Sequence, residues 1–276
     1  MKNRPRQSGL TLVETLVVVG IIAALVGLGL PAVRAFFHSF ESEDSVRTMI
    51  EAALSSARAI ATEQGEYVGV RFQRAYVKKG DPLNAPQYMV FIVHDKAATD
   101  LADGFRAVPG IKPIRLPDAF GVTDLTLVDR ELSGNKIDVV KEYLLSDDAG
   151  IDSPSEVNEI TTFSVVFSPS GHLVIHEVRV RNRNGKSGTS TASKDDTFNT
   201  VAKITDPNDP RGMFVQDDYV QERLGPESSR GHFWIYSKAE FTKVYNQQRA
   251  WSGCLSRLKD RPLSIAPLTG TLTGTH

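Results

Sequence analysis

Hydrophobic and polar residues follow three successive patterns along the chain, and the first is an uninterrupted apolar segment. Residues 15–33, TLVVVGIIAALVGLGLPAV, contain no charged side chain over 19 positions. As a helix, this segment would span about 28 Å, close to the ~30 Å hydrocarbon core of a bilayer. It exceeds the apolar stretch of ~7–15 residues in a cleavable secretory signal, so we expect it to stay in the membrane. Lys2, Arg4 and Arg6 precede it and Arg34 follows it, which favours a cytoplasmic N-terminus.

The second pattern is amphipathic. Between Val46 and Ala61, apolar residues recur at spacings of three and four, and charged residues occupy the opposite side. This periodicity is typical of a helix with one buried face, and Gly65 supplies a stop signal. We therefore expect one helix from Leu10 to about Gln64, with its first half in lipid and its second half packed on a globular head.

The third pattern consists of short runs rich in β-branched and aromatic residues, separated by turn-forming residues, which predicts a mainly antiparallel β-sheet head. The expected strands are Tyr67–Phe72, Tyr88–His94, Val122–Val128, Thr162–Phe167, Leu173–Asn182 and His232–Tyr236. A short helix is expected over Lys238–Ala250, with Phe241, Val244 and Tyr245 facing inward. Residues 267–276 are expected to form a frayed tail. The predicted fold class is therefore α+β.

Composition and charge narrow the range of functions. The chain has 32 Lys and Arg against 33 Asp and Glu, and this near-neutral balance argues against a dedicated nucleic-acid-binding protein. Its single cysteine, Cys254, excludes an internal disulfide and any zinc site that needs two thiolates. We expect Cys254 to be a small buried residue in the last helix.

Glu14 is the only ionisable residue between Arg6 and Arg34, and it lies just inside the apolar stretch. A carboxylate at that depth costs several kcal/mol unless it is paired, which marks it as a functional candidate. A glutamate near a helix end that reaches the interface is the alternative interpretation, and Glu14 taken alone leaves both open.

The residues around Glu14 carry a recognisable motif. Residues 8–14, SGLTLVE, follow a short basic leader and run directly into the apolar segment. This arrangement resembles the class III signal of type IV prepilins and pseudopilins. The resemblance implies that a prepilin peptidase cleaves between Gly9 and Leu10 and methylates the new amine of Leu10. It also implies a kink at Pro31 in the retained helix.

The same resemblance implies a domain organisation and a set of partners. Residues 1–9 would be the leader, 10–37 the transmembrane segment, 38–65 the amphipathic half of the helix and 66–266 a periplasmic head with a pilin-like fold. Glu14 would pair with the N-terminal amine of a neighbouring pilin or pseudopilin in the filament. The protein would thus be a single-pass protein of the bacterial inner membrane whose partners are prepilin peptidase, other pilin-type subunits and the lipid bilayer.

Three stretches of the head indicate a subtype. Ile50–Ala61, Val68–Phe72 and Phe167–Gly171 resemble the minor pseudopilins typified by general secretion pathway protein H, and fimbrial T-type minor pilins share these features. We therefore expect a minor pseudopilin of a type II secretion system, with a minor type IV pilin and a membrane-anchored periplasmic enzyme as alternatives. The head is longer than usual for these proteins, so 95–160 and 183–231 are candidate insertions.

Candidate chemistry in the head is sparse. The segment Ser168–His172 lacks the leading glycine of a nucleophile elbow, and the six histidines form no H-E-x-x-H motif. We expect no enzymatic activity, cofactor, metal or small-molecule substrate. Two questions stay open: whether the loop around Asp206 and Asp209 binds calcium, and whether a basic stretch contacts DNA phosphates. That stretch comprises Arg179, Arg181, Arg183 and Lys186.

Overall fold

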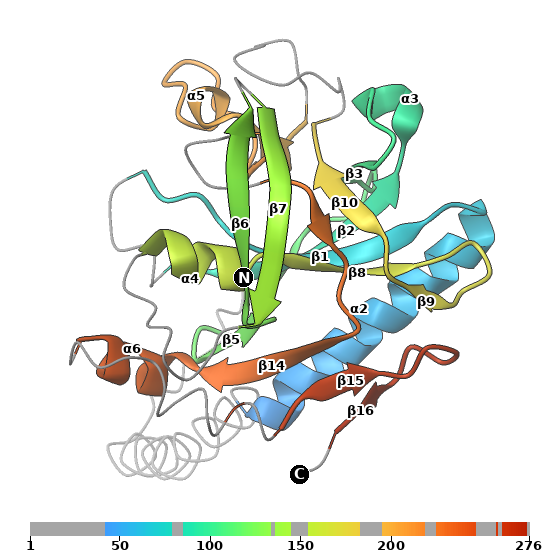
Figure 1. Cartoon of the computed structure of the whole chain (residues 1–276), viewed down its shortest axis with the longest axis vertical. Helices are drawn as coiled ribbons and strands as arrows, with labels where there is room; N and C mark the ends of the chain where they lie inside the picture. Colours follow the sequence, from blue (N-terminus) through green and yellow to red (C-terminus); the bar gives the residue numbers. More distant parts are fainter. Residues whose placement is uncertain are drawn as a thin grey trace, which may run out of the picture.

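The computed structural model describes residues 42–78, 85–133, 136–144, 154–182, 195–218, 225–246, 258 and 261–274. Figure 1 shows a helix, α2, that lies across the head between a large sheet and a smaller one. The helices are α2 (Glu43–Gln64), α3 (Lys96–Thr99), α4 (Pro154–Ile160), α5 (Val201–Ile204) and α6 (Lys238–Asn246). The architecture is α+β, as predicted, with an amphipathic helix packed on an antiparallel-rich sheet as in pilin-like folds.

Helix α2 is the amphipathic helix that the sequence predicts. Its buried residues are Val46, Ile50, Ala53, Leu54, Ala57 and Ala61. Gly65 ends the helix with a φ of 68°, and its N–H donates to the carbonyl of Ala61. The start differs from the expected range 38–65, because Ser42 is an N-cap with extended backbone angles whose side chain accepts from the N–H of Ser45. The helix of the described part of the chain therefore begins after Ser42, and the expected stretch from Leu10 to residue 41 lies outside the described residues.

The large sheet is built around β1, whose alternate residues face two different cores. Its strands lie in the order β13 (Glu227–Ser228), β10 (Glu177–Val180), β3 (Gly104–Ala107), β2 (Gln87–His94), β1 (Val68–Arg74), β8 (Phe163–Phe167) and β9 (Leu173–Val174), and β4 (Ile114–Arg115) also pairs with β2. All of these pairs are antiparallel except β10 with β3. Val70 of β1 packs toward α2, whereas its neighbour Arg71 lies on the opposite face, which is also buried.

The large sheet is rolled. Only Ile175 and His176 separate β9 from β10, although these strands lie near opposite edges of the sheet. Ser229, which follows β13, closes the gap: its N–H donates to the carbonyl of His176 and its hydroxyl donates to the carbonyl of Val174, both at 2.8 Å. The concave side of the roll therefore encloses a second hydrophobic cluster, which includes Val90, Ile92, Phe105, Val178, Val180, Phe198 and Phe214.

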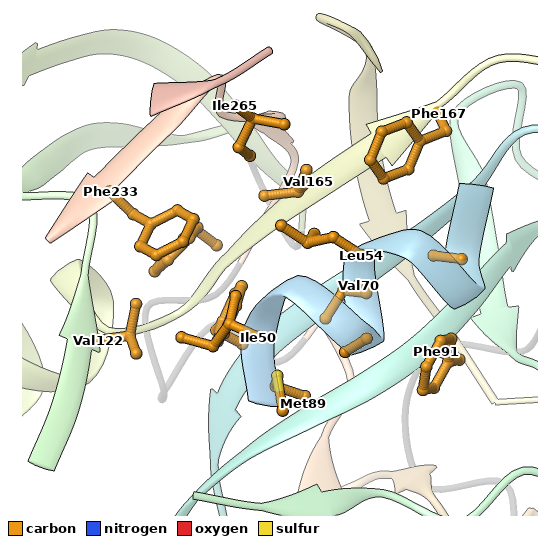
Figure 2. Close-up of a cluster of buried hydrophobic side chains, with 14 of the residues drawn as sticks. Ile50, Leu54, Val70, Met89, Phe91, Val122, Val165, Phe167, Phe233 and Ile265 are labelled. Atoms are coloured by element: carbon orange, nitrogen blue, oxygen red, sulfur yellow. The ribbon is translucent and has the colours of Figure 1, made fainter. Parts of the chain in front are cut away.

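The smaller sheet covers the other side of α2. It consists of β16 (Leu272–Thr273), β15 (Leu263–Ile265), β14 (His232–Ser237) and β5 (Phe120–Thr123), in that order. Figure 2 shows Ile50 and Leu54 of α2 among side chains of both sheets, including Val165 and Phe233. The helix thus supplies the central layer of the main hydrophobic core.

Two of the expected strands are interrupted. The stretch Val122–Val128 divides into β5 and β6 (Thr126–Ser133), because Leu125 has a φ of 53° that no strand tolerates. The stretch Leu173–Asn182 divides into β9 and β10 at the crossing between the edges of the roll. Tyr67–Phe72, Tyr88–His94, Thr162–Phe167 and His232–Tyr236 are confirmed as strands with shifts of one or two residues at their ends. In α6 Phe241 is buried as expected, whereas the side chains of Val244 and Tyr245 lie outside the described residues, as does Cys254.

The candidate insertions contribute to the body of the head. Residues 95–160 supply β3, which lies between β2 and β10, and a two-stranded hairpin of β6 with β7 (Lys136–Leu144). Residues 183–231 supply β13 and the two-stranded pair of β11 (Phe198–Asn199) with β12 (Phe214–Val215). Neither stretch is a detachable addition, since β3 and β13 complete the large sheet.

The C-terminal segment is packed, which corrects the expectation of a frayed tail from residue 267. Leu272 is 6% exposed and belongs to the main core. Arg58 of α2 donates to the carbonyls of Gly171 and Thr269 at 2.8 and 3.0 Å, and Arg47 donates to that of Leu272 at 3.2 Å. Arg47 and Arg58 therefore hold the C-terminal segment through its backbone carbonyls. Because backbone groups are the acceptors, the residue types of this segment do not indicate that it is packed.

Truncation of a buried α2 residue tests the role of this helix. We expect Leu54→Ala to lower the free energy of unfolding by about 2–5 kcal/mol, because it removes a fully buried side chain and leaves a cavity. Ser55, the next residue of α2, is exposed, so Ser55→Ala should change the free energy of unfolding by less than about 0.5 kcal/mol. Urea denaturation of the full chain in detergent micelles measures both, and equal effects would contradict the central position of α2.

Candidate functional site

The residues that the sequence marks for processing and assembly lie outside the described part of the chain. These are Gly9, Leu10, Glu14 and Pro31. No helix within the described ranges is long and apolar enough to cross a membrane. The described part begins at Ser42, so it shows how the head holds the helix that follows the N-terminal segment.

The turn Ser168–His172 is a structural element under α2. The hydroxyls of Ser168 and Ser170 are hydrogen bonded at 2.8 Å, and that of Ser170 lies 3.4 Å from Nδ1 of His172. Gly171 has a φ of 76°, and a Cβ there would lie 2.9 Å from Thr62 of α2. The glycine thus permits both the turn and its close approach to the helix, which accounts for this pattern without catalysis.

The acidic loop considered for calcium holds a cation that belongs to the chain itself. Nζ of Lys203 donates to Oδ2 of Asp206 and Oδ2 of Asp209 at 3.3 and 3.1 Å. The Lys203 ammonium and Arg211 keep the pKa of Asp209 below its ordinary value, and the N–H of Asn208 does so for Asp206. Among the described residues, no group of three or more His, Cys, Asp or Glu side chains is arranged to hold a metal ion.

The described arginines of the basic stretch are paired with carboxylates. Arg179 lies 3.3 Å from Asp103, and Arg181 forms an ion pair with Asp218 and donates to the carbonyl of Thr99. Arg183 and Lys186 lie outside the described residues. Since an arginine already paired with an acid has less charge to offer a phosphate, this arrangement favours the charge-paired strand face over a DNA contact.

A buried charge network inside the roll is the main polar feature that the sequence did not predict. Its first centre is Arg71, whose side chain is 1% exposed. Its Nη2 donates to Asp217 at 2.6 Å, its Nη1 donates to Glu227 at 2.8 Å and to Ser164 at 3.2 Å, and its Nε donates to Gln73 at 2.7 Å. Arg71 therefore joins β1, β8 and the two segments that carry the acids.

The second centre of the network is Arg230. Its Nε donates to Asp124 and its Nη1 donates to Glu142, both at 2.6 Å. The remaining carboxylate oxygens accept from backbone groups: Asp124 from the N–H of Thr126 and Glu142 from the N–H of Ser228, both at 3.0 Å. This centre fastens the β6–β7 hairpin to the segment that follows β13.

The network contains more negative than positive groups. Its members are Arg71, Arg230, Asp124, Glu142, Asp217 and Glu227, so four carboxylates face two guanidinium groups. Burial raises the pKa of Asp124 to about 7 against the opposing effect of Arg230. Burial likewise raises the pKa of Asp217 to about 7 against Arg71, and the nearby Glu227 adds to the rise. Asp124 and Asp217 inside the roll are therefore partly protonated near neutral pH.

One signal in the sequence pointed to this network. Within the strand VGVRFQR, Arg71 and Gln73 interrupt a run of apolar positions. A charged residue in the middle of such a strand indicates either a solvated face or a buried partner. Its acidic partners lie 146 and 156 residues away, so sequence reasoning had no means to identify them.

Comparison with known proteins bears on the N-terminal segment. Residues 4–30 match the family model of the prokaryotic N-terminal methylation motif. This motif is the class III signal of type IV prepilins. The resemblance of residues 8–14, SGLTLVE, to that signal is therefore confirmed, and the chain carries a prepilin-type signal. No curated protein and no solved structure matches the chain. The match supports a type IV pilin or pseudopilin and does not distinguish between them.

The charge network generates a pH prediction. An acid whose pKa is raised in the folded state favours folding below its unfolded pKa, and this contribution is lost as the pH rises through the folded pKa. With Asp124 and Asp217 raised from 3.8 to about 7, we expect the free energy of unfolding to fall by about 1 kcal/mol or more per pH unit between about pH 5 and 7. His232, whose pKa partial desolvation lowers, contributes in the opposite direction but is a single, exposed group.

Urea denaturation of the full chain in detergent at pH 5, 6, 7 and 8 measures this slope. Asp217→Asn should reduce the slope by about half, since one of the two titrating groups is removed. Asp118→Asn, which alters an exposed carboxylate outside the network, should leave the slope unchanged. Stability that rises between pH 5 and 7 would contradict the prediction.

Proposed function

We propose that this protein is a minor pseudopilin of a type II secretion system, a structural subunit of the periplasmic pseudopilus that helps to drive protein export. The observation that carries the proposal is the N-terminal methylation motif at residues 4–30. That motif implies processing by a prepilin peptidase, an N-terminal membrane anchor and assembly with pilin-type subunits. The resemblance of Ile50–Ala61 and Phe167–Gly171 to minor pseudopilins supports the subtype.

Processing prepares the N-terminus for assembly. Cleavage between Gly9 and Leu10 removes Lys2, Arg4 and Arg6, so the charge changes from 32 − 33 = −1 to 29 − 33 = −4. It creates an amine at Leu10, about one helical turn before Glu14. Both charges are unfavourable in lipid, and pairing Glu14 with the amine of a neighbouring subunit removes much of that cost. The pair would set how one subunit is placed along the filament relative to the next.

The structure of the head suits a mechanical role. α2 lies between two sheets and is tied to the C-terminal segment by Arg47 and Arg58. A force applied to the N-terminal segment would therefore act on the whole core rather than on one edge. Ser42, with its extended backbone, separates the helix of the head from the preceding residues.

A minor type IV pilin that helps to initiate pili or take up DNA is the second candidate, because the same methylation motif serves both kinds of filament. Deletion of the gene in the source bacterium separates the two. Loss of extracellular enzyme secretion with normal pili supports the pseudopilin, and loss of pili with normal secretion supports the pilin. Complementation with the wild-type gene controls for effects on neighbouring genes.

Processing at the methylation motif is directly testable. Co-expression with a prepilin peptidase should remove nine residues and leave an N-methylated leucine, because SGLTLVE places the cleavage after Gly9. Intact-mass measurement of the purified chain reports the result, and a chain from cells without the peptidase is the control. An uncut chain, or a cut after the apolar segment, would overturn the assignment of a prepilin-type signal.

The pairing role of Glu14 makes a separate prediction. Glu14→Gln keeps the shape of the side chain but leaves the partner's amine without a counter-charge in low dielectric, which costs about 3–5 kcal/mol. We expect co-assembly with partner subunits to weaken by about a hundredfold or more, with cleavage unaffected. Pull-down of partner pseudopilins from membranes, alongside the mass of the variant, measures both. Undiminished capture with normal cleavage would show that Glu14 is only an interfacial residue.

A further inference from the structure

Two histidines meet at one end of the rolled sheet. Tyr67, which directly precedes β1, lies in a row with His94 of β2 and Phe105 of β3: the N–H of His94 donates to the carbonyl of Tyr67 at 2.9 Å, and His94 is in register with Phe105. His176, from the crossing between β9 and β10, lies against all three rings. Its ring centroid is 4.7 Å from that of Tyr67, 5.7 Å from that of His94 and 5.5 Å from that of Phe105.

The hydrogen bonds of the two rings determine where their lone pairs are. Nε2 of His94 contacts the carbonyl oxygen of Ala102 at 2.8 Å, and Nδ1 of His176 contacts the carbonyl oxygen of Glu177. A carbonyl only accepts, so each of these nitrogens carries the proton and donates it. In the neutral rings, Nδ1 of His94 and Nε2 of His176 then hold lone pairs, and neither has a hydrogen-bond partner among the described residues. Histidine ligands of metals commonly donate their second ring N–H to a backbone carbonyl in this way.

The separation of the rings suits one metal ion between them. With a Zn–N bond of ~2.0–2.1 Å, each ring centroid lies about 3.2 Å from the metal, so two centroids are about 5.2 Å apart at a tetrahedral angle and about 6.4 Å apart at a linear one. The observed 5.7 Å falls within this range. Both side chains are half-buried, so an ion reaches them from solvent without unfolding of the sheet.

From this geometry we propose that His94 and His176 bind a divalent transition-metal cation of the Zn²⁺ type, with water completing its coordination. Imidazole nitrogen prefers such borderline cations over Mg²⁺ and Ca²⁺, which take oxygen ligands. The ion would connect the end of β2 to the crossing that closes the roll. Bound metal would therefore stabilise the closed sheet, since it binds the folded chain and not the separated histidines.

Isothermal titration of the tag-free full chain with ZnCl₂ in detergent at pH 7.5 tests the site. We expect one Zn²⁺ per chain, no competition from millimolar Mg²⁺ or Ca²⁺, and loss of binding at acidic pH, because a protonated imidazole cannot bind metal. His94→Gln and His176→Gln should each weaken binding by about tenfold or more. His172→Gln changes an exposed histidine outside the pair and should bind as the wild type does. His176→Cys, which replaces one zinc ligand with another, should retain binding.

X-ray absorption at the zinc edge of the loaded wild-type chain gives a readout that needs no variant. Two imidazole nitrogens together with oxygen ligands support the site. A shell without imidazole, or equal affinity for wild type and both Gln variants, shows that zinc binds elsewhere and overturns the proposal. Absence of any zinc binding overturns it as well.

Discussion

The burial of one face of α2 between two sheets is the interaction on which the rest of the head depends. Ile50 and Leu54 are fully buried, and they contact strands that lie far apart in the sequence (Figure 2). Among the described residues, α2 packs against the apolar faces of both sheets, so without the helix much of that apolar surface would be exposed to water. The C-terminal segment depends on the same helix, because Arg47 and Arg58 bind its carbonyl groups.

The roll of the large sheet introduces a second constraint of a different kind. Its concave side buries the guanidinium of Arg71 together with Asp217 and Glu227. A buried ion pair is weak evidence for stability, since desolvation of the charges offsets most of their attraction. Its effect here is specific: an unpaired Arg71 would be costly, so the acids from two distant segments have one favourable position. The network therefore selects this closure of the roll over alternative packings of similar hydrophobic content.

The two constraints assign different tasks to the two faces of β1. The face toward α2 is apolar and packs against the buried side of that helix. The face toward the roll carries polar groups, including the charge network and, at one end, the aromatic row that holds His94. The first face therefore supplies hydrophobic packing, and the second carries buried groups whose raised pKa values make the head sensitive to pH.

The sequence alone determined the features that are read locally. The N-terminal methylation motif is recognised from the linear order of its residues and the apolar run from its length, so neither requires a folded head to be recognised. The amphipathic period of α2 and the strands β1, β2, β8 and β14, which are rich in β-branched or aromatic residues, were likewise predictable from local pattern.

Tertiary structure decided the rest. β3 has only four residues and exists because β2 and β10 flank it, and β9 separates from β10 because the sheet rolls. The backbone turns at Leu125 although its residue type favours a strand, since the chain must leave β5 for the hairpin. Arg71 finds its acids, and His94 finds His176, only after distant segments have come together. Such partners lie beyond any local pattern, because their contact energy depends on burial and distance that the folded chain alone establishes.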